Sequence, residues 1–355
     1  MNTVKYRPFL RAATLLALVV FLAIFPVVIS PNDAVNTIAV FTLIGAVAVM
    51  GWNIFSGYTG YISLGHSVYY GFGAYTLGVL SVDWRLPGGW EPFLLLPLAG
   101  LIGGLVALPL GWIALRARRH TFVVISIAFV FIFQLLAYNL HGLTGGSAGT
   151  IMPLIPWVAP YANLPFYYVA LALLCIVTLV SWWVRHAKFG LGLLAIRDDE
   201  DRALSLGVKT GAFKLSAYVL STSFVAMAGA IFAYYVGSAY PEQSFNPVVD
   251  LTIALMAFLG GVGTVVGPLL GAFIITPLQQ WLDLQFGGQG VNLMIYGVLF
   301  LATILILPRG IVISLQQNWN RWQATHSSRR DLGTDGRPGG SAREPGQLLT
   351  KQREG

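Results

Sequence analysis

Charged residues are scarce in this chain, at 10% of 355 residues, whereas an ordinary soluble domain has roughly 25%. This scarcity excludes a soluble globular enzyme. Hydrophobic residues make up 56% of the chain and aromatic residues 13%, and there are 40 glycines. Glycine lets membrane helices pack closely, and aromatic residues gather where helices meet the membrane surface. The composition therefore predicts a membrane protein with many spans.

The residues that catalysis needs are also lacking. The sequence has no G-x-x-x-x-G-K-[ST] phosphate loop, no G-x-S-x-G motif and no Cys/His cluster for a metal. The single cysteine, Cys175, cannot form an intramolecular disulfide. We therefore expect no catalytic residue, no metal and no cofactor, and any energy for active transport must come from another polypeptide.

Acidic residues are missing from the interiors of the long apolar runs, which argues against a proton relay. Those predicted on the outer side are Asp33, Asp83, Glu91, Glu242, Asp250 and Asp283. His66 is the main titratable residue within a predicted span. We interpret it as a hydrogen-bonded packing residue rather than a proton carrier.

The charge-free runs predict an all-α, polytopic fold, because a helix needs roughly 20 apolar residues to cross the hydrocarbon core. Ten spans are predicted, near residues 12–30, 36–55, 62–81, 93–115, 121–140, 165–184, 215–237, 250–262, 265–282 and 291–307. With ten spans both termini lie on one side, which then holds all of the 21 Lys and Arg residues except Arg85. Cytoplasmic loops carry such an excess of basic residues, so both termini are predicted to be cytoplasmic.

A nine-span alternative, with residues 251–282 as one span, would put the basic C-terminal segment outside and is disfavoured for that reason. The membrane domain is predicted to cover residues 1–313. Residues 314–355 are poor in apolar side chains and rich in Arg, Gly and Ser. This composition favours a disordered cytoplasmic tail, although a role at lipid headgroups is an alternative.

A glycine-rich segment lies at the predicted turn between the second and third spans. Its notable residues are Gly57, Tyr58, Thr59, Gly60, Ser63, Gly65, His66, Gly71 and Gly73. One interpretation is close helix packing through small residues. The other is an irregular segment whose free backbone groups and polar side chains line a path for a solute. The sequence leaves both open.

The longest predicted cytoplasmic loop, about residues 185–214, contains a second notable pattern. Asp198 or Asp199 suits the N-cap of a short helix, acidic residues fill its first turn, and Gly207 suits the position after its end. Ala203 and Leu206 are predicted to share one side of it, as are Leu204 and Val208. The helix is either part of an ordinary solvated loop or a docking element for a cytoplasmic partner.

A third cluster, Gly260, Gly261 and Gly263, marks the predicted cytoplasmic turn between two short spans. Short, glycine-interrupted segments point to a translocation site. A tight turn with close packing is the alternative interpretation.

Five segments in order give the chain a family resemblance. They are residues 57–75, 143–147 (Leu-Thr-Gly-Gly-Ser), 195–208 (beginning Ala-Ile-Arg-Asp-Asp-Glu), 259–268 (beginning Leu-Gly-Gly-Val-Gly-Thr) and 307–310 (Leu-Pro-Arg-Gly). Together they resemble the LivM-like permease subunits of branched-chain amino-acid ABC importers. Asp201 and Arg202 depart from the family pattern, in which an apolar and a small residue are usual.

The resemblance implies a set of partners in the cell membrane of a prokaryote. They are a second homologous permease subunit, two cytoplasmic ABC ATPases that hydrolyse the ATP, an external solute-binding protein and the lipid bilayer, with no nucleic acid. The docking segment implied for the ATPase contains Arg197, Asp198, Asp199, Glu200, Ala203, Leu206 and Gly207. The implied function is import of branched-chain or related amino acids. Alternatives are a permease for urea or short amides, and a secondary carrier that works without ATP.

Overall fold

The computed structural model describes residues 20–28, 33–158, 161–286, 294, 295, 297, 298, 301, 302, 305, 310–312 and 314. The described part is mostly helical. In chain order its elements are α2 (Asp33–Trp52), the π-helix η1 (Asn53–Gly57), α3 (His66–Asp83), the 3-10 helix η2 (Glu91–Leu95), α4 (Leu96–Ala114), α5 (Arg119–Asn139), α6 (His141–Thr144), the 3-10 helix η3 (Gly146–Ala148), β1 (Thr150–Ile151), α7 (Leu164–His186), α8 (Lys188–Asp198), α9 (Glu200–Ser205), α10 (Thr210–Val236), β2 (Ser238–Ala239), α11 (Pro241–Ser244), α12 (Pro247–Gly260) and α13 (Val266–Phe286).

Helices occupy the positions predicted for the second to ninth spans. Among the described residues, five helical segments are long and apolar enough to cross a membrane: 34–57, 91–114, 119–139, 164–186 and 210–236. The chain is therefore a polytopic helical membrane protein. Of the first and last predicted spans only parts are described, and the tail from residue 315 lies outside the described residues. The count of ten and the side of the termini stay predictions.

The centre of the bundle is α10, which packs against α2, α3 and α4. Small residues allow this approach. A Cβ atom on Gly73 of α3 would overlap the carbonyl oxygen of Ala226, and one on Gly229 of α10 would overlap that of Tyr70. The backbones of the two helices therefore touch at two points, as small residues permit in lipid.

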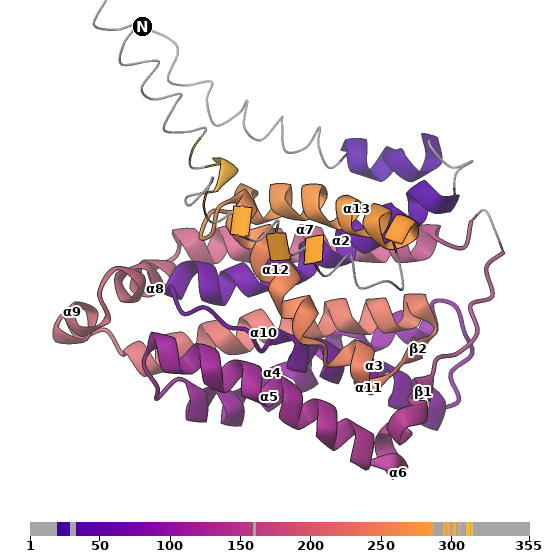
Figure 1. Cartoon of the computed structure of the whole chain (residues 1–355), viewed down its shortest axis with the longest axis horizontal. Coiled ribbons are helices and arrows are strands. Elements are labelled where there is room, and N and C mark those ends of the chain that lie inside the picture. The colour runs from indigo at the N-terminus through magenta and orange to yellow at the C-terminus, as the bar shows by residue number, and fades with distance from the viewer. Residues whose placement is uncertain are drawn as a thin grey trace, which may run out of the picture. The chain divides into compact units, whose positions relative to one another are not determined.

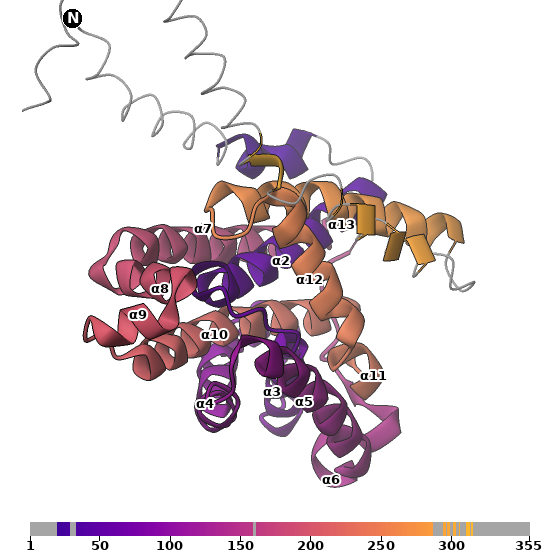
Figure 2. The same cartoon turned by 60° about the vertical axis from the view of Figure 1, so that its left-hand side comes forward.

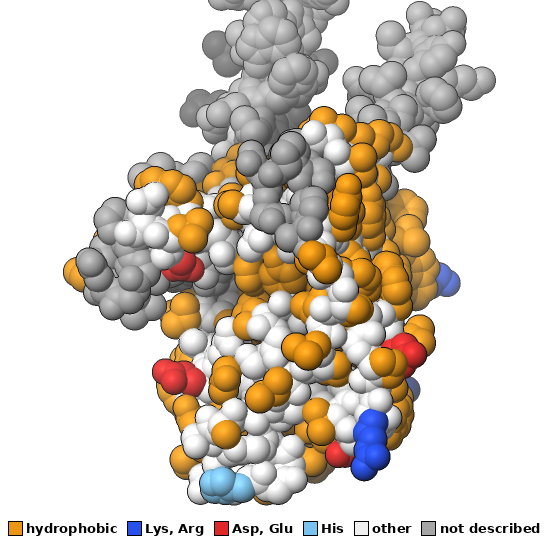
Figure 3. Space-filling model, turned by 90° about the vertical axis from the view of Figure 1, so that its right-hand side faces the viewer, with side chains coloured by type: hydrophobic (Ala, Val, Ile, Leu, Met, Phe, Trp, Pro, Cys, Tyr) orange, Lys and Arg blue, Asp and Glu red, His pale blue; other side chains and the backbone are white. Residues whose placement is uncertain are grey.

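The two ends of the bundle differ (Figure 1). Helices α8 and α9 project at one end, whereas α6, β1 and β2 lie at the other. Thr150 of β1 pairs with Ala239 of β2 in an antiparallel ladder, so two loops far apart in the sequence join there. Figure 3 shows this second end, with isolated charged side chains among polar and apolar ones.

Cysteine labelling can check which end faces the cytoplasm. In a Cys175→Ser background, Leu206→Cys beside α9 should react with a membrane-impermeant maleimide only after cells are permeabilised. Ala148→Cys at the opposite end should react in intact cells, because the positive-inside rule places it outside. Both positions are exposed in the structure. Labelling of Leu206→Cys in intact cells would contradict the predicted orientation.

Candidate coupling site

Helix α9 forms for the reasons seen in its sequence. The Asp199 side chain accepts a hydrogen bond of 3.0 Å from the backbone N–H of Arg202 and so caps the helix. Glu200 and Asp201 fill the first turn, where the helix dipole favours negative charge. Gly207 follows the helix end with a φ of +85°, a conformation that costs glycine little. The predicted short, capped helix is present.

The predicted apolar face of this helix is partly wrong. Ala203 is 2% exposed, whereas Leu206 is 83% exposed, so the two do not share a side. The helix has only six residues and Leu206 is its C-cap, beyond the helical periodicity on which the prediction relied. The side chain of Leu204 is 60% exposed and faces outward, as that of Leu206 does. Two leucines thus face outward at the end of the bundle.

Glu200 points inward and holds α9 against the bundle. Its Oε1 accepts a hydrogen bond of 2.5 Å from Lys214 Nζ of α10, and its Oε2 accepts a hydrogen bond from the Tyr61 hydroxyl. Partial burial disfavours the charged carboxylate, but the hydrogen bonds from Lys214 and Tyr61 and the charges of Lys214 and Arg119 outweigh it and lower the pKa of Glu200. Glu200 is therefore ionised at neutral pH and acts as an anchor.

A second anchor joins the end of α8 to the glycine-rich segment. The Arg119 guanidinium of α5 donates hydrogen bonds of 2.6 and 2.8 Å to the carbonyl oxygens of Ile196 and Arg197. The Arg197 side chain in turn donates a bond of 2.8 Å to the carbonyl oxygen of Gly57. Its aliphatic part lies beside Gly60, where an added Cβ would be 3.1 Å from Arg197 Cγ.

The third glycine cluster meets the same junction. The Asn53 side chain accepts a hydrogen bond of 2.8 Å from the Gly263 N–H and donates one of 2.9 Å to the Thr264 carbonyl. Arg185 Nη1 donates to the Gly263 carbonyl oxygen. Three segments that are separate in the sequence are therefore joined by polar contacts at one end of the bundle.

Comparison with known proteins gives this junction its context. The family described as "Branched-chain amino acid transport system / permease component" matches residues 34–305. The chain belongs to this family. The permease is 28% identical to the high-affinity branched-chain amino acid transport system permease protein LivM of Salmonella typhimurium, over 83% of the chain and 74% of that protein.

Two further relatives extend the comparison. The LivM protein of Escherichia coli strain K12 is 27% identical over the same shares of both chains. The autoinducer 2 import system permease protein LsrC of Salmonella paratyphi B is 29% identical over 42% of the permease and 44% of LsrC. No solved structure matches the permease.

The remaining candidates for a solute path lie in the interior of the permease. The Tyr58 hydroxyl is 2.7 Å from Ser181 Oγ, and Thr59 Oγ1 donates to the Phe55 carbonyl. The backbone of residues 60–65 is irregular, as one interpretation predicted. Its polar groups are bonded by neighbouring side chains: Trp52 Nε1 donates to the Ser63 carbonyl, and Ser126 Oγ accepts from the Leu64 N–H.

The glycines that were predicted to line a solute path are closely packed. A Cβ on Gly65 would overlap the Ser126 carbonyl, one on Gly71 the ring of Phe245, and one on Gly260 the Gly267 carbonyl. Gly261 and Gly263 adopt positive φ values of 126° and 79°. These contacts support the packing interpretation for the glycines themselves.

The middle of the permease contains a buried polar cluster that the sequence did not predict. His66 Nε2 is 2.7 Å from Ser221 Oγ, near the middle of α10. Next to His66, the Ser67 N–H and hydroxyl both donate to the Asp250 carboxylate. Asp250 lies in the first turn of α12 and is 1% exposed, so the expectation that acidic residues are missing from the interior is wrong at this position. The cause is that α12, which Asn246 caps, begins against the start of α3. Figure 2 shows α12 running from α11 toward α13.

Several residues of the coupling site escaped the sequence analysis. Asn53, Tyr61, Arg119, Arg185 and Lys214 all make contacts described above, but each comes from a different segment. A polar Asn53 inside a charge-free run was the available signal. Within the described residues, no three His, Cys, Asp or Glu side chains gather in a way that could hold a metal ion.

Proposed function

We propose that this chain is the permease subunit of an ATP-driven importer and forms the translocation path for branched-chain or related amino acids. In this proposal an external solute-binding protein delivers the solute, a second permease subunit completes the path, and two cytoplasmic ATPases hydrolyse the ATP. Membership of the branched-chain permease family supports this assignment. The location is the cell membrane of a prokaryote.

The anchored α8–α9 element is the observation that carries the proposal. It presents the exposed Leu204 and Leu206 at the end of the bundle, where a partner can cover them. The Glu200 and Arg197 contacts tie it to α10 and to Gly57. A displacement of α9 by an ATPase would therefore reach the helices of the path, because the polar contacts resist independent movement.

In this proposal the ATPase docks on the outward-facing residues of the α8–α9 element. Asp198, Asp201, Leu204, Leu206 and Gly207 are exposed, whereas Glu200 and Arg197 hold the element from inside. The conformational change then needs no covalent chemistry in this chain. ATP binding would draw the ATPases together, and the helices would alternate between outward and inward openings.

Reconstitution tests this proposal. Liposomes containing the permease pair, the ATPases and the loaded binding protein should accumulate labelled leucine only when ATP is supplied on the cytoplasmic side. Liposomes with the permease alone should not accumulate it. Concentrative uptake by the permease alone would instead establish a secondary carrier, and uptake of urea or short amides in preference to leucine would establish the other substrate class.

A further inference from the structure

A cavity of about 230 Å³ lies between the α12–α13 pair and a wall made by α2, α3 and α10. At about 30 Å³ per water, this volume holds roughly eight waters. Pockets for drug-sized ligands are larger, about 300–1,000 Å³. The cavity is therefore the size of a small metabolite. None of the glycines predicted for the path lines it, although Gly45 does.

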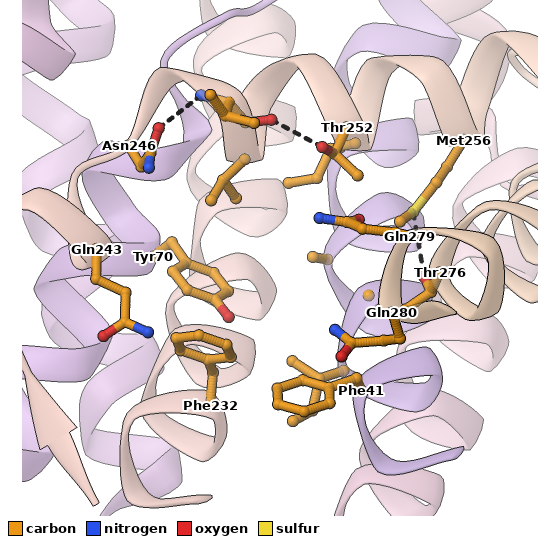
Figure 4. Close-up of a pocket in the computed structure, with 16 residues that line it drawn as sticks. Phe41, Tyr70, Phe232, Gln243, Asn246, Thr252, Met256, Thr276, Gln279 and Gln280 are labelled. Atoms are coloured by element: carbon orange, nitrogen blue, oxygen red, sulfur yellow. Dashed lines mark hydrogen bonds between the residues drawn. The ribbon is translucent and has the colours of Figure 1, made fainter. Parts of the chain in front are cut away.

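The wall of the cavity has a polar part and an apolar part (Figure 4). Six of its side chains carry amides or hydroxyls other than tyrosine: Gln243, Asn246, Thr252, Thr276, Gln279 and Gln280. Figure 4 shows Gln243 beside Tyr70 and Phe232, with Gln279 and Gln280 across the space. Apolar side chains, among them Ile44, Ile253 and Met256, fill the rest of the wall.

Of the described residues that line this cavity, none is Asp, Glu, Lys, Arg or His. Burying an ion without a partner of opposite charge costs far more than burying a neutral group. The wall therefore disfavours solutes with a net charge. It equally disfavours a lipid tail, which offers no hydrogen-bond partner to the amides of Gln243 and Gln280. A small neutral solute with an aliphatic part and a polar end fits the apolar and the polar parts of the wall.

The cavity also lies at the right depth for a transported solute. Tyr70 follows His66 by one helical turn on α3, and His66 contacts the middle of α10. Thr252 lies near the start of α12, the helix that begins against the start of α3. Solute sites of transporters lie near the membrane midplane, where interrupted helices begin.

We infer that this cavity is a solute site on the translocation path, which takes small solutes without net charge that carry an aliphatic part and a polar end. Zwitterionic amino acids with aliphatic side chains belong to this class. The inference rests on the proposed function. It adds the place in this chain where the solute is held and the residues that face it.

A cavity-filling substitution tests the site. In the reconstituted importer, Thr252→Phe should reduce leucine uptake about tenfold or more, because the ring would occupy space that the solute needs. ATPase stimulation by the loaded binding protein should persist, because the coupling site is untouched. The matched control is Leu251→Phe, which adds a similar ring to the neighbouring residue, a side chain 43% exposed, and should leave uptake within about twofold of the wild type.

A second pair of variants tests the chemical class and does not depend on the folding of Thr252→Phe. Gln243→Glu adds a negative charge to the wall at nearly constant shape and should reduce leucine uptake about tenfold. Gln243→Asn keeps the amide and should retain most of the activity.

Wild-type uptake by Thr252→Phe, or by Gln243→Glu if Thr252→Phe does not assemble, would overturn the solute site while leaving the proposed function intact. Failure of the wild-type importer to use ATP would instead overturn the proposed function.

Discussion

A Glu200→Lys permease, assembled with its ATPases, is expected to hydrolyse ATP at the basal rate but to lose the stimulation that solute-loaded binding protein causes. In the wild type, Lys214 Nζ lies 2.5 Å from Glu200 Oε1. The substitution places a second ammonium group beside it. Repulsion would release α9 from its inner anchor. A change of roughly 1.4 kcal/mol in the free energy of activation changes a rate about tenfold. Because the release of α9 should uncouple the ATPases from the path, stimulated hydrolysis and uptake should fall at least tenfold.

Two further variants separate the anchor from the general effect of charge. Asp83→Lys makes the same charge change on an exposed side chain at the end of α3, away from the α8–α9 element, and should change stimulation by about twofold or less, as surface charges do. Exchanging the pair, with Glu200→Lys and Lys214→Glu together, should restore much of the stimulation, because the Tyr61 hydroxyl can donate or accept. No recovery in the exchanged pair would refute the anchor.

The second large effect is expected for Gly229→Leu, which should lower the amount of folded permease in the membrane severalfold or more. A Cβ at this position would overlap the carbonyl oxygen of Tyr70 in α3. Backbone atoms cannot move aside as a flexible side chain can. Overpacking costs about 1–3 kcal/mol and occasionally more, and total stabilities are about 5–15 kcal/mol. The yield of monodisperse protein in detergent and its thermal unfolding measure the effect.

Gly211→Leu is the matched control on the same helix. An added Cβ there meets no atom within 4 Å, and leucine favours a helix over glycine by up to about 1 kcal/mol. This variant should therefore be recovered in wild-type amounts. Equal yields of Gly229→Leu and the wild type would show that α3 and α10 do not pack as described.

The sequence predicted the helices well because membrane insertion depends on the composition of each segment. A long run without charge that faces lipid favours a helix, because a helix bonds its own backbone groups. The same locality explains α9, since Asp199, the acidic first turn and Gly207 act within a few residues of one another. Its outward side was predicted less well, because the tertiary contact that buries Ala203 carries no local signal.

Asp250 illustrates the limit of this reasoning. Charge near the start of a predicted span is normally a sign of the membrane surface, and the sequence offers no hint that α12 starts against α3. The polar contacts of Asn53 and Arg197 likewise join residues more than a hundred positions apart. Such contacts depend on which helices become neighbours, and the apolar runs are too alike to specify this.

The contact between Asp250 and Ser67 limits how the transporter can move. Helix α3 begins after Gly65, which has no side chain to bond its first N–H groups, and the carboxylate from α12 supplies that bond. Separating Asp250 from Ser67 would leave a carboxylic acid and an uncapped helix N-terminus without hydrogen-bond partners, in a membrane interior that has no water to replace them. Rocking of the protein during a transport cycle should therefore carry α3 and the beginning of α12 as a single rigid body, with the sliding surfaces elsewhere.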